Sequence, residues 1–139
     1  MLEDFIALSR ILTGVENLSV ELGRQYLDRL ESSPFQPLLR QILERFHRLE
    51  PGKRRAGQVK TKIVADDALR PMVCQIILLW YTSSMQDNLG VQPPASPVMR
   101  FGTPEEYFSG LAWQIMGAHV PGLSGGYFGH WRYRPENEP

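Results

Sequence analysis

The sequence predicts an all-α fold: a compact bundle of four or five helices followed by a long extended aromatic C-terminal tail. Apolar residues recur at spacings of three and four along most of residues 1–118, which is the periodicity of amphipathic helices. Residues 119–135 are instead rich in glycine and proline, which disfavour helix and weaken strand. That stretch also carries large rings with too much apolar area for a solvated tail, namely Tyr127, Phe128, Trp131 and Tyr133. We therefore expect one domain, with a helical body at 1–118 and a tail at 119–139 that lies along a surface.

Composition narrows the possible functions. The chain has 139 residues, 15 basic and 15 acidic side chains, and a pI near 6.8. A neutral chain is not expected to capture nucleic acid or an anionic membrane by charge alone. The one cysteine, Cys74, cannot form an intrachain disulfide, and we expect it to be buried because it lies in an apolar run. The longest apolar run, around Met72 to Tyr81, is far shorter than the ~20 residues of a membrane span.

Two short helices are expected first. Gly14 is placed to end the first of them in a left-handed conformation. Ser19 is placed to cap the second, which Ser32-Ser33-Pro34 stops. The apolar stripes comprise Phe5, Ile6, Leu8, Ile11 and Leu12 in the first helix and Leu22, Tyr26, Leu27 and Leu30 in the second.

A third helix is predicted to begin at Pro37, with one apolar face and one charged face that also carries His47. Pro51-Gly52 ends it, and residues 50–65 are expected to form a polar connector. The basic cluster at 53–62 is open to two interpretations, a phosphate or nucleic-acid patch and a solvated linker. The linker is favoured because no aromatic residue interleaves the cluster as a stacking platform.

The central helix of the domain is expected at Met72 to Tyr81, because a helix that is apolar on all sides is buried on all sides. Asp66 or Asp67 is predicted to cap it, and the helix is expected to continue to about Asp87. Trp80 and Tyr81 are expected to form hydrogen bonds at its rim.

A capped helix is predicted after a proline-rich connector. Thr103-Pro104-Glu105-Glu106 supplies an N-cap, a proline at the first helical position and a capping-box glutamate. Trp113 lies off the apolar stripe of this helix, where it is expected to face the tail or a partner. The stripe comprises Tyr107, Phe108, Leu111, Ala112, Ile115 and Met116.

No catalytic, cofactor-binding or metal-binding constellation is recognised. His47, His119 and His130 are scattered without a second ligand three or four residues away. The Ser124-Gly125-Gly126 turn lacks the lysine and helix of a phosphate loop. We therefore expect a helical body that binds something. Two rival hypotheses are a small helical enzyme acting alone and a stand-alone adaptor or nucleic-acid-binding protein that uses the 53–62 basic loop.

Four segments carry a family resemblance over nearly the whole length. They are Phe5-x-x-Leu8-Ser9-x-x-Leu12-Thr13-Gly14 followed by Leu18, Leu22-Gly23 and Tyr26-Leu27; Trp80-Tyr81 followed by Asp87-Asn88; Thr103-Pro104-Glu105-Glu106-Tyr107 with Trp113-Gln114; and Gly125-Gly126-Tyr127-Phe128-Gly129-His130-Trp131 with Pro135. In order and spacing, the chain resembles the small subunits of bacterial FAD-dependent sugar and polyol dehydrogenase complexes, often labelled sorbitol dehydrogenase small subunits.

The resemblance implies a non-catalytic subunit without a cofactor of its own. In such complexes a large flavoprotein of the glucose-methanol-choline type binds FAD and oxidises the sugar, and electrons pass to a cytochrome or another acceptor. The small subunit wraps onto the flavoprotein and aids its folding and stability. We expect the partner-binding residues to be aromatic and arginine anchors, namely Trp113, Tyr127, Phe128, His130, Trp131, Arg132 and Tyr133.

Two departures from the family pattern bear on location. Family members often open with a twin-arginine export signal, whereas this chain begins at its first predicted helix. The chain as written is therefore expected in the cytoplasm, and in the periplasm if such a signal has been removed. Family members also often have a cysteine before the closing aromatic segment that can bond to the large subunit. Residues 120–124 contain none, which fits a noncovalent complex.

Overall fold

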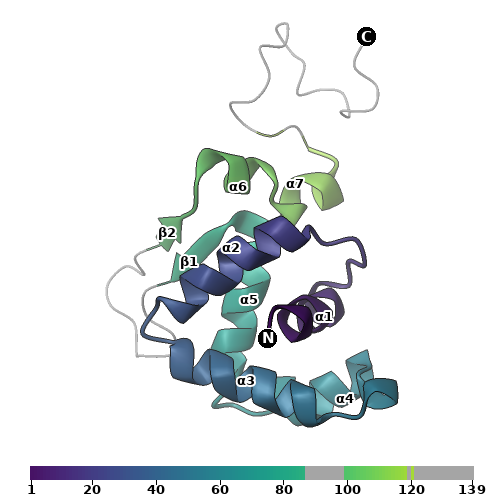
Figure 1. The fold of residues 1–139 in the computed structure, drawn as a ribbon. Helices are drawn as coiled ribbons and strands as arrows, with labels where there is room; N and C mark the ends of the chain where they lie inside the picture. Colours follow the sequence, from purple (N-terminus) through teal and green to yellow (C-terminus); the bar gives the residue numbers. More distant parts are fainter. Residues whose placement is uncertain (87–98, 119, 121–139) are drawn as a thin grey trace, which may run out of the picture.

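A computed structural model describes residues 1–86, 99–118 and 120 of the chain (Figure 1). The described residues confirm the all-α prediction, with one two-stranded sheet added to the helices. The elements in chain order are α1 (Leu2–Thr13), α2 (Val20–Glu31), α3 (Gln36–Arg48), the 3-10 turn η1 (Pro51–Lys53), α4 (Ala56–Val59), the π-helical turn η2 (Lys60–Val64), α5 (Arg70–Thr82), β1 (Ser84–Gln86), β2 (Met99–Phe101), α6 (Pro104–Phe108) and α7 (Leu111–Met116).

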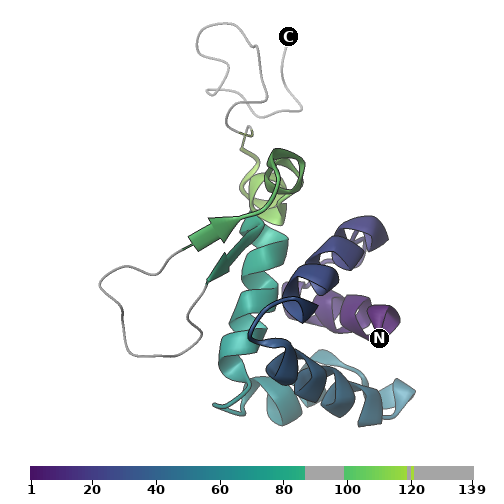
Figure 2. The same ribbon diagram turned by 60° about the vertical axis from the view of Figure 1, so that its left-hand side comes forward.

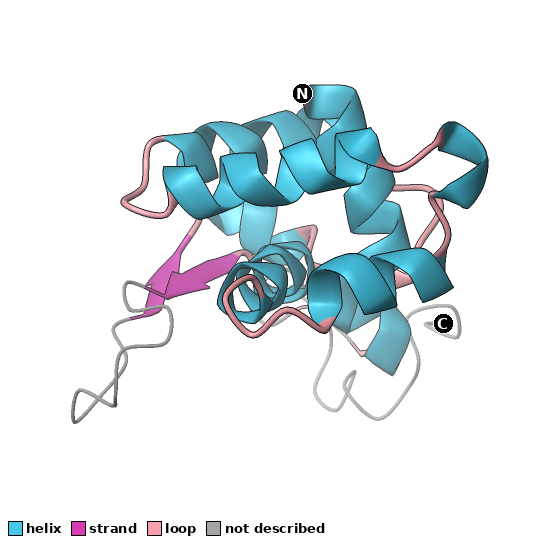
Figure 3. Ribbon diagram, turned by 90° about the horizontal axis from the view of Figure 1, so that it is seen from below, coloured by secondary structure: helices cyan, strands magenta, loops and turns pink. Residues whose placement is uncertain are grey.

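Helix α5 runs through the middle of the molecule and packs against α1, and α2 and α3 pack against α1 and against each other (Figures 1 and 2). The N-terminal end of α5 lies near α3 and α4. The β1–β2 hairpin and helices α6 and α7 gather at its C-terminal end, as Figure 1 shows. Seen from below, the small antiparallel sheet stands at the edge of an otherwise helical body (Figure 3).

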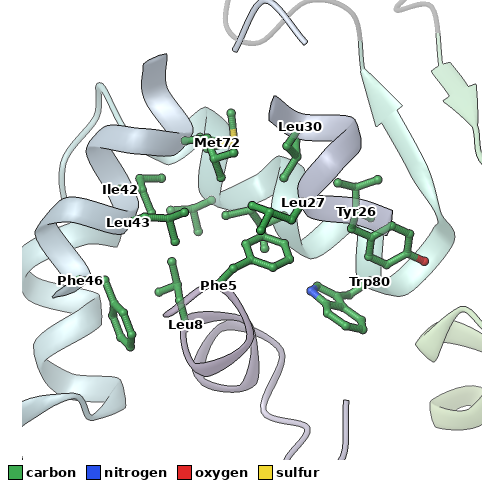
Figure 4. Packing of buried hydrophobic residues seen from close by; sticks show 14 of the residues in the cluster. Phe5, Leu8, Tyr26, Leu27, Leu30, Ile42, Leu43, Phe46, Met72 and Trp80 are labelled. Carbon is green, nitrogen blue, oxygen red and sulfur yellow. The ribbon is translucent and has the colours of Figure 1, made fainter. Parts of the chain in front are cut away.

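The core lies where α1, α2, α3 and α5 meet. Phe5 and Leu8 of α1 point into the same space as the apolar residues of the other three helices (Figure 4). The rings of Tyr26 and Trp80 meet edge to face, with centroids 5.2 Å apart. Gly23 lets α2 approach this layer, because a Cβ there would overlap Ile6 and lie 3.4 Å from the Trp80 ring.

Four of the predicted helix ends are confirmed. Gly14 ends α1 in the left-handed region, with φ of 73°. The Ser19 side chain accepts a hydrogen bond of 3.2 Å from the Leu22 amide at the start of α2. Pro37 lies in the first turn of α3, and the Thr103 hydroxyl accepts a hydrogen bond from the Glu106 amide at the start of α6. These signals depend on one residue and the backbone groups of the adjacent turn, so they can be predicted from a short stretch of sequence.

The expected extension of the central helix to about Asp87 was wrong. Helix α5 ends at Thr82 because Ser83 adopts a left-handed conformation, with φ of 54°, and residues 84–86 form strand β1. The side-chain amide of Gln75 favours this change. Its Nε2 donates to the Ser84 carbonyl at 3.0 Å, and its Oε1 accepts from the Gln86 amide at 2.8 Å. A buried glutamine of α5 thus bonds to the backbone of β1 in addition to the pairing of β1 with β2.

The polar connector expected at residues 50–65 is also more ordered than predicted. It forms η1, α4 and η2, and it buries Val59 and Ile63 against the core. Asp66 does not cap α5, which begins at Arg70 with Leu69 as its N-cap. Instead, the Asp66 carboxylate accepts from the Ala68 amide in the preceding turn and pairs with Arg45 at 2.5 Å. Asp67 lies outside the helix as well and pairs with Arg70.

The expectation that α5 is buried on all sides needs two corrections. Cys74 is exposed, because the helix turns one narrow side to solvent at that position. Trp80 does not bond outward at the rim: it is 1% exposed, and its indole nitrogen has no hydrogen-bond partner among the described residues. Tyr81 does make the expected bond, since its hydroxyl donates to the Thr13 carbonyl at 3.1 Å.

Candidate functional site

The segment of residues 99–118, which we call the C-terminal module, contains β2, α6 and α7. A single capped helix was predicted here, but the structure has two short helices that break at Ser109-Gly110. The break is fixed by close packing, because a Cβ on Gly110 would lie 2.7 Å from the Tyr81 carbonyl oxygen. Helices of five and six residues are too short to be stable alone, so the module depends on its contacts with the body.

Four rings of the module form an aromatic cluster, defined here as Phe101, Tyr107, Phe108 and Trp113. Tyr107 lies at its centre, with ring centroids 6.5 Å from Phe101, 6.0 Å from Phe108 and 5.1 Å from Trp113. All three pairs have the edge-to-face geometry that aromatic rings prefer. The Trp113 indole donates to the Tyr107 carbonyl at 2.9 Å, which fixes α7 against α6.

This cluster borders a shallow apolar hollow of about 370 Å³. Its lining combines the edge of β2 with the first turn of α6 and comprises Phe101, Gly102, Thr103, Pro104, Tyr107 and Phe108. The polar surface in it is small, so a side chain that entered it would meet mainly rings and methylene groups.

The module also exposes large apolar side chains. Phe101 is 61% exposed, Ile115 59% and Met116 63%. Ile115 and Met116 were expected to belong to the apolar stripe of a buried helix, but only Leu111 of α7 reaches the core. Ile115 and Met116 are neighbours in α7, and Phe101 borders the apolar hollow; exposed apolar patches often mark protein interaction sites. The C-terminal module is therefore the strongest candidate for a docking surface among the described residues.

A buried polar junction joins the module to the body, and Ser83 is at its centre. The Ser83 hydroxyl donates to the Glu106 carbonyl at 2.5 Å, so it must accept from the Tyr26 hydroxyl 2.9 Å away. The Ser83 carbonyl accepts from the Gly102 amide at 2.9 Å. Burial raises the pKa of the Tyr26 hydroxyl above its ordinary value, although its bond to Ser83 partly offsets this.

Arg29 of α2 closes the junction with an ion pair to Glu106 of α6. Its guanidinium also lies 3.4 Å from the Ser83 carbonyl. The Glu106 carboxylate lies beside Gly102 at the helix start, but it pairs with Arg29 rather than with the Thr103 amide, as a capping box would require. Gly102 is needed beside this pair, because a Cβ there would overlap the Glu106 carboxylate and the Arg29 guanidinium.

The predicted partner-binding residues divide into two groups. Trp113 lies in the aromatic cluster, half-buried against Tyr107. The others lie outside the described residues, and their role stays a prediction: Tyr127, Phe128, His130, Trp131, Arg132 and Tyr133. Sequence analysis did not single out Phe101, which is the most exposed ring of the described residues. A large ring directly after a proline-rich connector and before a helix cap was the available signal.

Other parts of the described chain give less evidence of a functional site. Among residues 1–86, 99–118 and 120, no group of three or more His, Cys, Asp or Glu could hold a metal ion. His47 is exposed as predicted and pairs with Asp4. In the basic 53–62 loop, Arg54 serves the fold, since it pairs with Asp4 and donates to the Leu49 and His47 carbonyls at the end of α3. Within the described part of the chain, no helix combines the length and apolar character that crossing a bilayer requires.

Comparison with known proteins identifies the family of the chain. A search of curated proteins found no match. A family model described as "Membrane bound FAD containing D-sorbitol dehydrogenase" matches residues 1–93, which covers α1 to α5 and strand β1 but not the C-terminal module. This range is more than half of the 139 residues and includes the segments around Leu12-Thr13-Gly14 and Trp80-Tyr81 on which the resemblance depended. The chain therefore belongs to the FAD-containing D-sorbitol dehydrogenase family, as one of its subunits.

Proposed function

We propose that this protein is the non-catalytic small subunit of an FAD-dependent sugar or polyol dehydrogenase complex. It binds the large catalytic subunit, which holds the FAD, and it supports the folding and stability of that subunit. Electrons taken from the sugar pass from the flavin to a cytochrome or another acceptor within the complex. In this proposal the chain contributes a docking surface and no reacting group.

The observation that carries the proposal is the exposed apolar surface of the C-terminal module. Phe101, Ile115 and Met116 are each more than half exposed, whereas the core rings of the body are almost fully buried. Large apolar side chains in water reduce the solubility of a free chain, and covering them on a partner contributes about 25 cal/mol per Å² of apolar area removed from water. Family membership supports an FAD-containing subunit as the partner, because the family is one of FAD-containing dehydrogenases.

Tail residues extend the proposed surface. Residues 121–139 follow the module directly in the sequence and carry Tyr127, Phe128, Trp131 and Tyr133. Aromatic and arginine side chains are the usual anchors of protein interfaces. The tail follows the module closely in the sequence. A partner that binds the tail rings would therefore also lie near the exposed apolar side chains of the module.

Co-expression with the catalytic subunit tests the proposal. The full chain should yield soluble catalytic subunit with FAD bound, whereas a chain truncated after Pro121 should lose most of that yield. Circular dichroism of the truncated chain alone should retain the helical signal, because the described core lies within residues 1–111. Full-length W131A/Y133A should reduce the yield in the same direction.

Two results would contradict the proposal. One is a catalytic subunit that is equally soluble and equally loaded with FAD in the absence of this chain. The other is sugar oxidation by this chain when it is purified alone, which would favour the rival hypothesis of a small helical enzyme.

A further inference from the structure

We propose that the Arg29–Glu106 ion pair is a positioning element that holds the aromatic cluster in its binding geometry before the catalytic subunit arrives. This inference rests on the proposed function and adds a specific mechanism to it. It assigns a role in binding to Glu106, which is almost fully buried, and to Arg29, which also borders a second hollow beside Phe101.

The first step is that the C-terminal module cannot hold its own shape. Helices α6 and α7 have five and six residues, and β2 has three. Isolated helices of this length are not stable in water. The geometry of Phe101, Tyr107 and Phe108 must therefore come from the contacts of the module with the body.

The second step is that, besides the backbone pairing of β2 with β1, those contacts form two anchors on either side of Tyr107 and Phe108. One anchor is the polar junction, where Arg29 and Ser83 of the body hold Gly102 and Glu106. The other is apolar, with Gly110 against the Tyr81 backbone and Leu111 in the core. Tyr107 and Phe108 lie between the anchors in sequence and face the hollow.

The third step is that the polar anchor depends on the ion pair. The Glu106 side chain is 6% exposed and that of Arg29 is 25% exposed, so removal of either charge leaves the other poorly solvated. Without the pair, the bonds of Ser83 to Gly102 and Glu106 and the neighbouring β1–β2 pairing are the remaining polar links between the module and the body on this side of the rings. A docking surface that is ordered before binding loses less conformational entropy when it binds. Loosening the pair should therefore weaken binding without removing any contact at the interface.

The test compares Glu106→Gln with Asp66→Asn in the full chain. Both substitutions remove one carboxylate from an arginine pair, but Asp66 and Arg45 lie at the α3 and η2 end of the molecule, opposite the module (Figure 1). Binding of each chain to the purified FAD-containing catalytic subunit is measured by calorimetry over a range of temperatures. Amide hydrogen exchange of each free chain is measured in parallel.

For Glu106→Gln we expect roughly tenfold or more weaker binding, faster exchange confined to residues 99–116, and a more negative heat capacity change of binding. The last result follows because the partner would now order the module as it binds. Asp66→Asn should bind like the wild type. Glu106→Asp, which keeps the charge, should restore part of the affinity.

Three outcomes would overturn the inference. Equal affinity of wild type and Glu106→Gln would show that the pair does not position the surface. Weaker binding with unchanged exchange and unchanged heat capacity would make Glu106 a direct contact. If the wild type itself does not bind the catalytic subunit, the proposed function fails and this inference fails with it, and that result is distinct from the first two.

Discussion

The body and the C-terminal module of this protein are held together by different kinds of interaction. In the body, α1, α2, α3 and α5 meet through a continuous apolar core in which Phe5, Tyr26 and Trp80 are almost fully buried. In the module, only Leu111 belongs to that core, and most of the attachment is polar, through the backbone pairing of β2 with β1 and the junction of Arg29, Ser83 and Glu106. Apolar packing contributes most of the stability and depends little on the orientation of the groups in contact. Hydrogen bonds and ion pairs require a defined orientation of their groups and add a small net gain in stability.

Under the proposed function, the contrast separates the residues that stabilise the fold from those that bind the partner. The body carries the free energy of folding and has few exposed large apolar side chains. The module leaves its rings uncovered, and its position is set by polar groups with defined geometry. Substitutions should therefore affect the two regions in distinct ways.

The largest effect is expected for Phe5→Ala. Phe5 is fully buried, so the substitution leaves a cavity between α1, α2 and α5 that should reduce the free energy of unfolding by about 3–5 kcal/mol. The body and the module should then unfold in one transition, because the module has no stability of its own. Denaturant unfolding followed by circular dichroism and by tryptophan fluorescence measures this. A module signal that survives the loss of the body would contradict the comparison.

A smaller and more local effect is expected for Gly102→Ala. The new methyl group would overlap the Glu106 carboxylate and should cost about 1–3 kcal/mol. Hydrogen exchange should become faster in residues 99–116 while residues 2–82 keep their protection. Gly57→Ala is the matched control, because no atom lies within 4 Å of a Cβ at that helical position. The control should be neutral or slightly stabilising. Equal effects at both sites would remove the distinction between the two regions.

The smallest effect at neutral pH is expected for Tyr26→Phe, which removes the hydroxyl that donates to Ser83 and should cost about 1 kcal/mol. The pH dependence sharpens the comparison. Because the pKa of Tyr26 is raised in the folded chain, the unfolded chain ionises first as the pH rises above about 10. The stability of the wild type should fall through that range, and the Tyr26→Phe variant should lose less. Urea unfolding between about pH 8 and about pH 11 brackets the ordinary tyrosine pKa and measures this, and parallel alkaline profiles for the two chains would contradict it.

Sequence patterns predicted the body better than the module, for a physical reason. Helix ends at Gly14, Ser19 and Thr103 depend on local backbone chemistry, which is written in a few adjacent residues. The apolar period then located the core helices. The junction between the two regions joins Arg29 to Glu106 across 77 positions, and no local pattern indicates such a pairing.

The errors have the same origin. Glu106 fits a capping box in sequence, but Arg29 offers it a buried partner of opposite charge. Helix was expected to run through Ser83 and Gln86, but the Gln75 side chain supplies hydrogen bonds that favour a strand. In each case a contact between residues distant in the sequence overrode the local structural preference. The exposed Phe101 was missed because exposure itself depends on how the hairpin is placed.

Gln75 has a consequence for quality control in the cell. Its amide joins the start of strand β1 to the middle of the central helix, so the order of the proposed docking surface depends on the packing of α5. A copy with a damaged interior therefore cannot present a competent face. Under the proposed function, such a copy would not bind the flavoprotein, which would stay free for a correctly folded copy. Assembly would therefore select for subunits with an intact core.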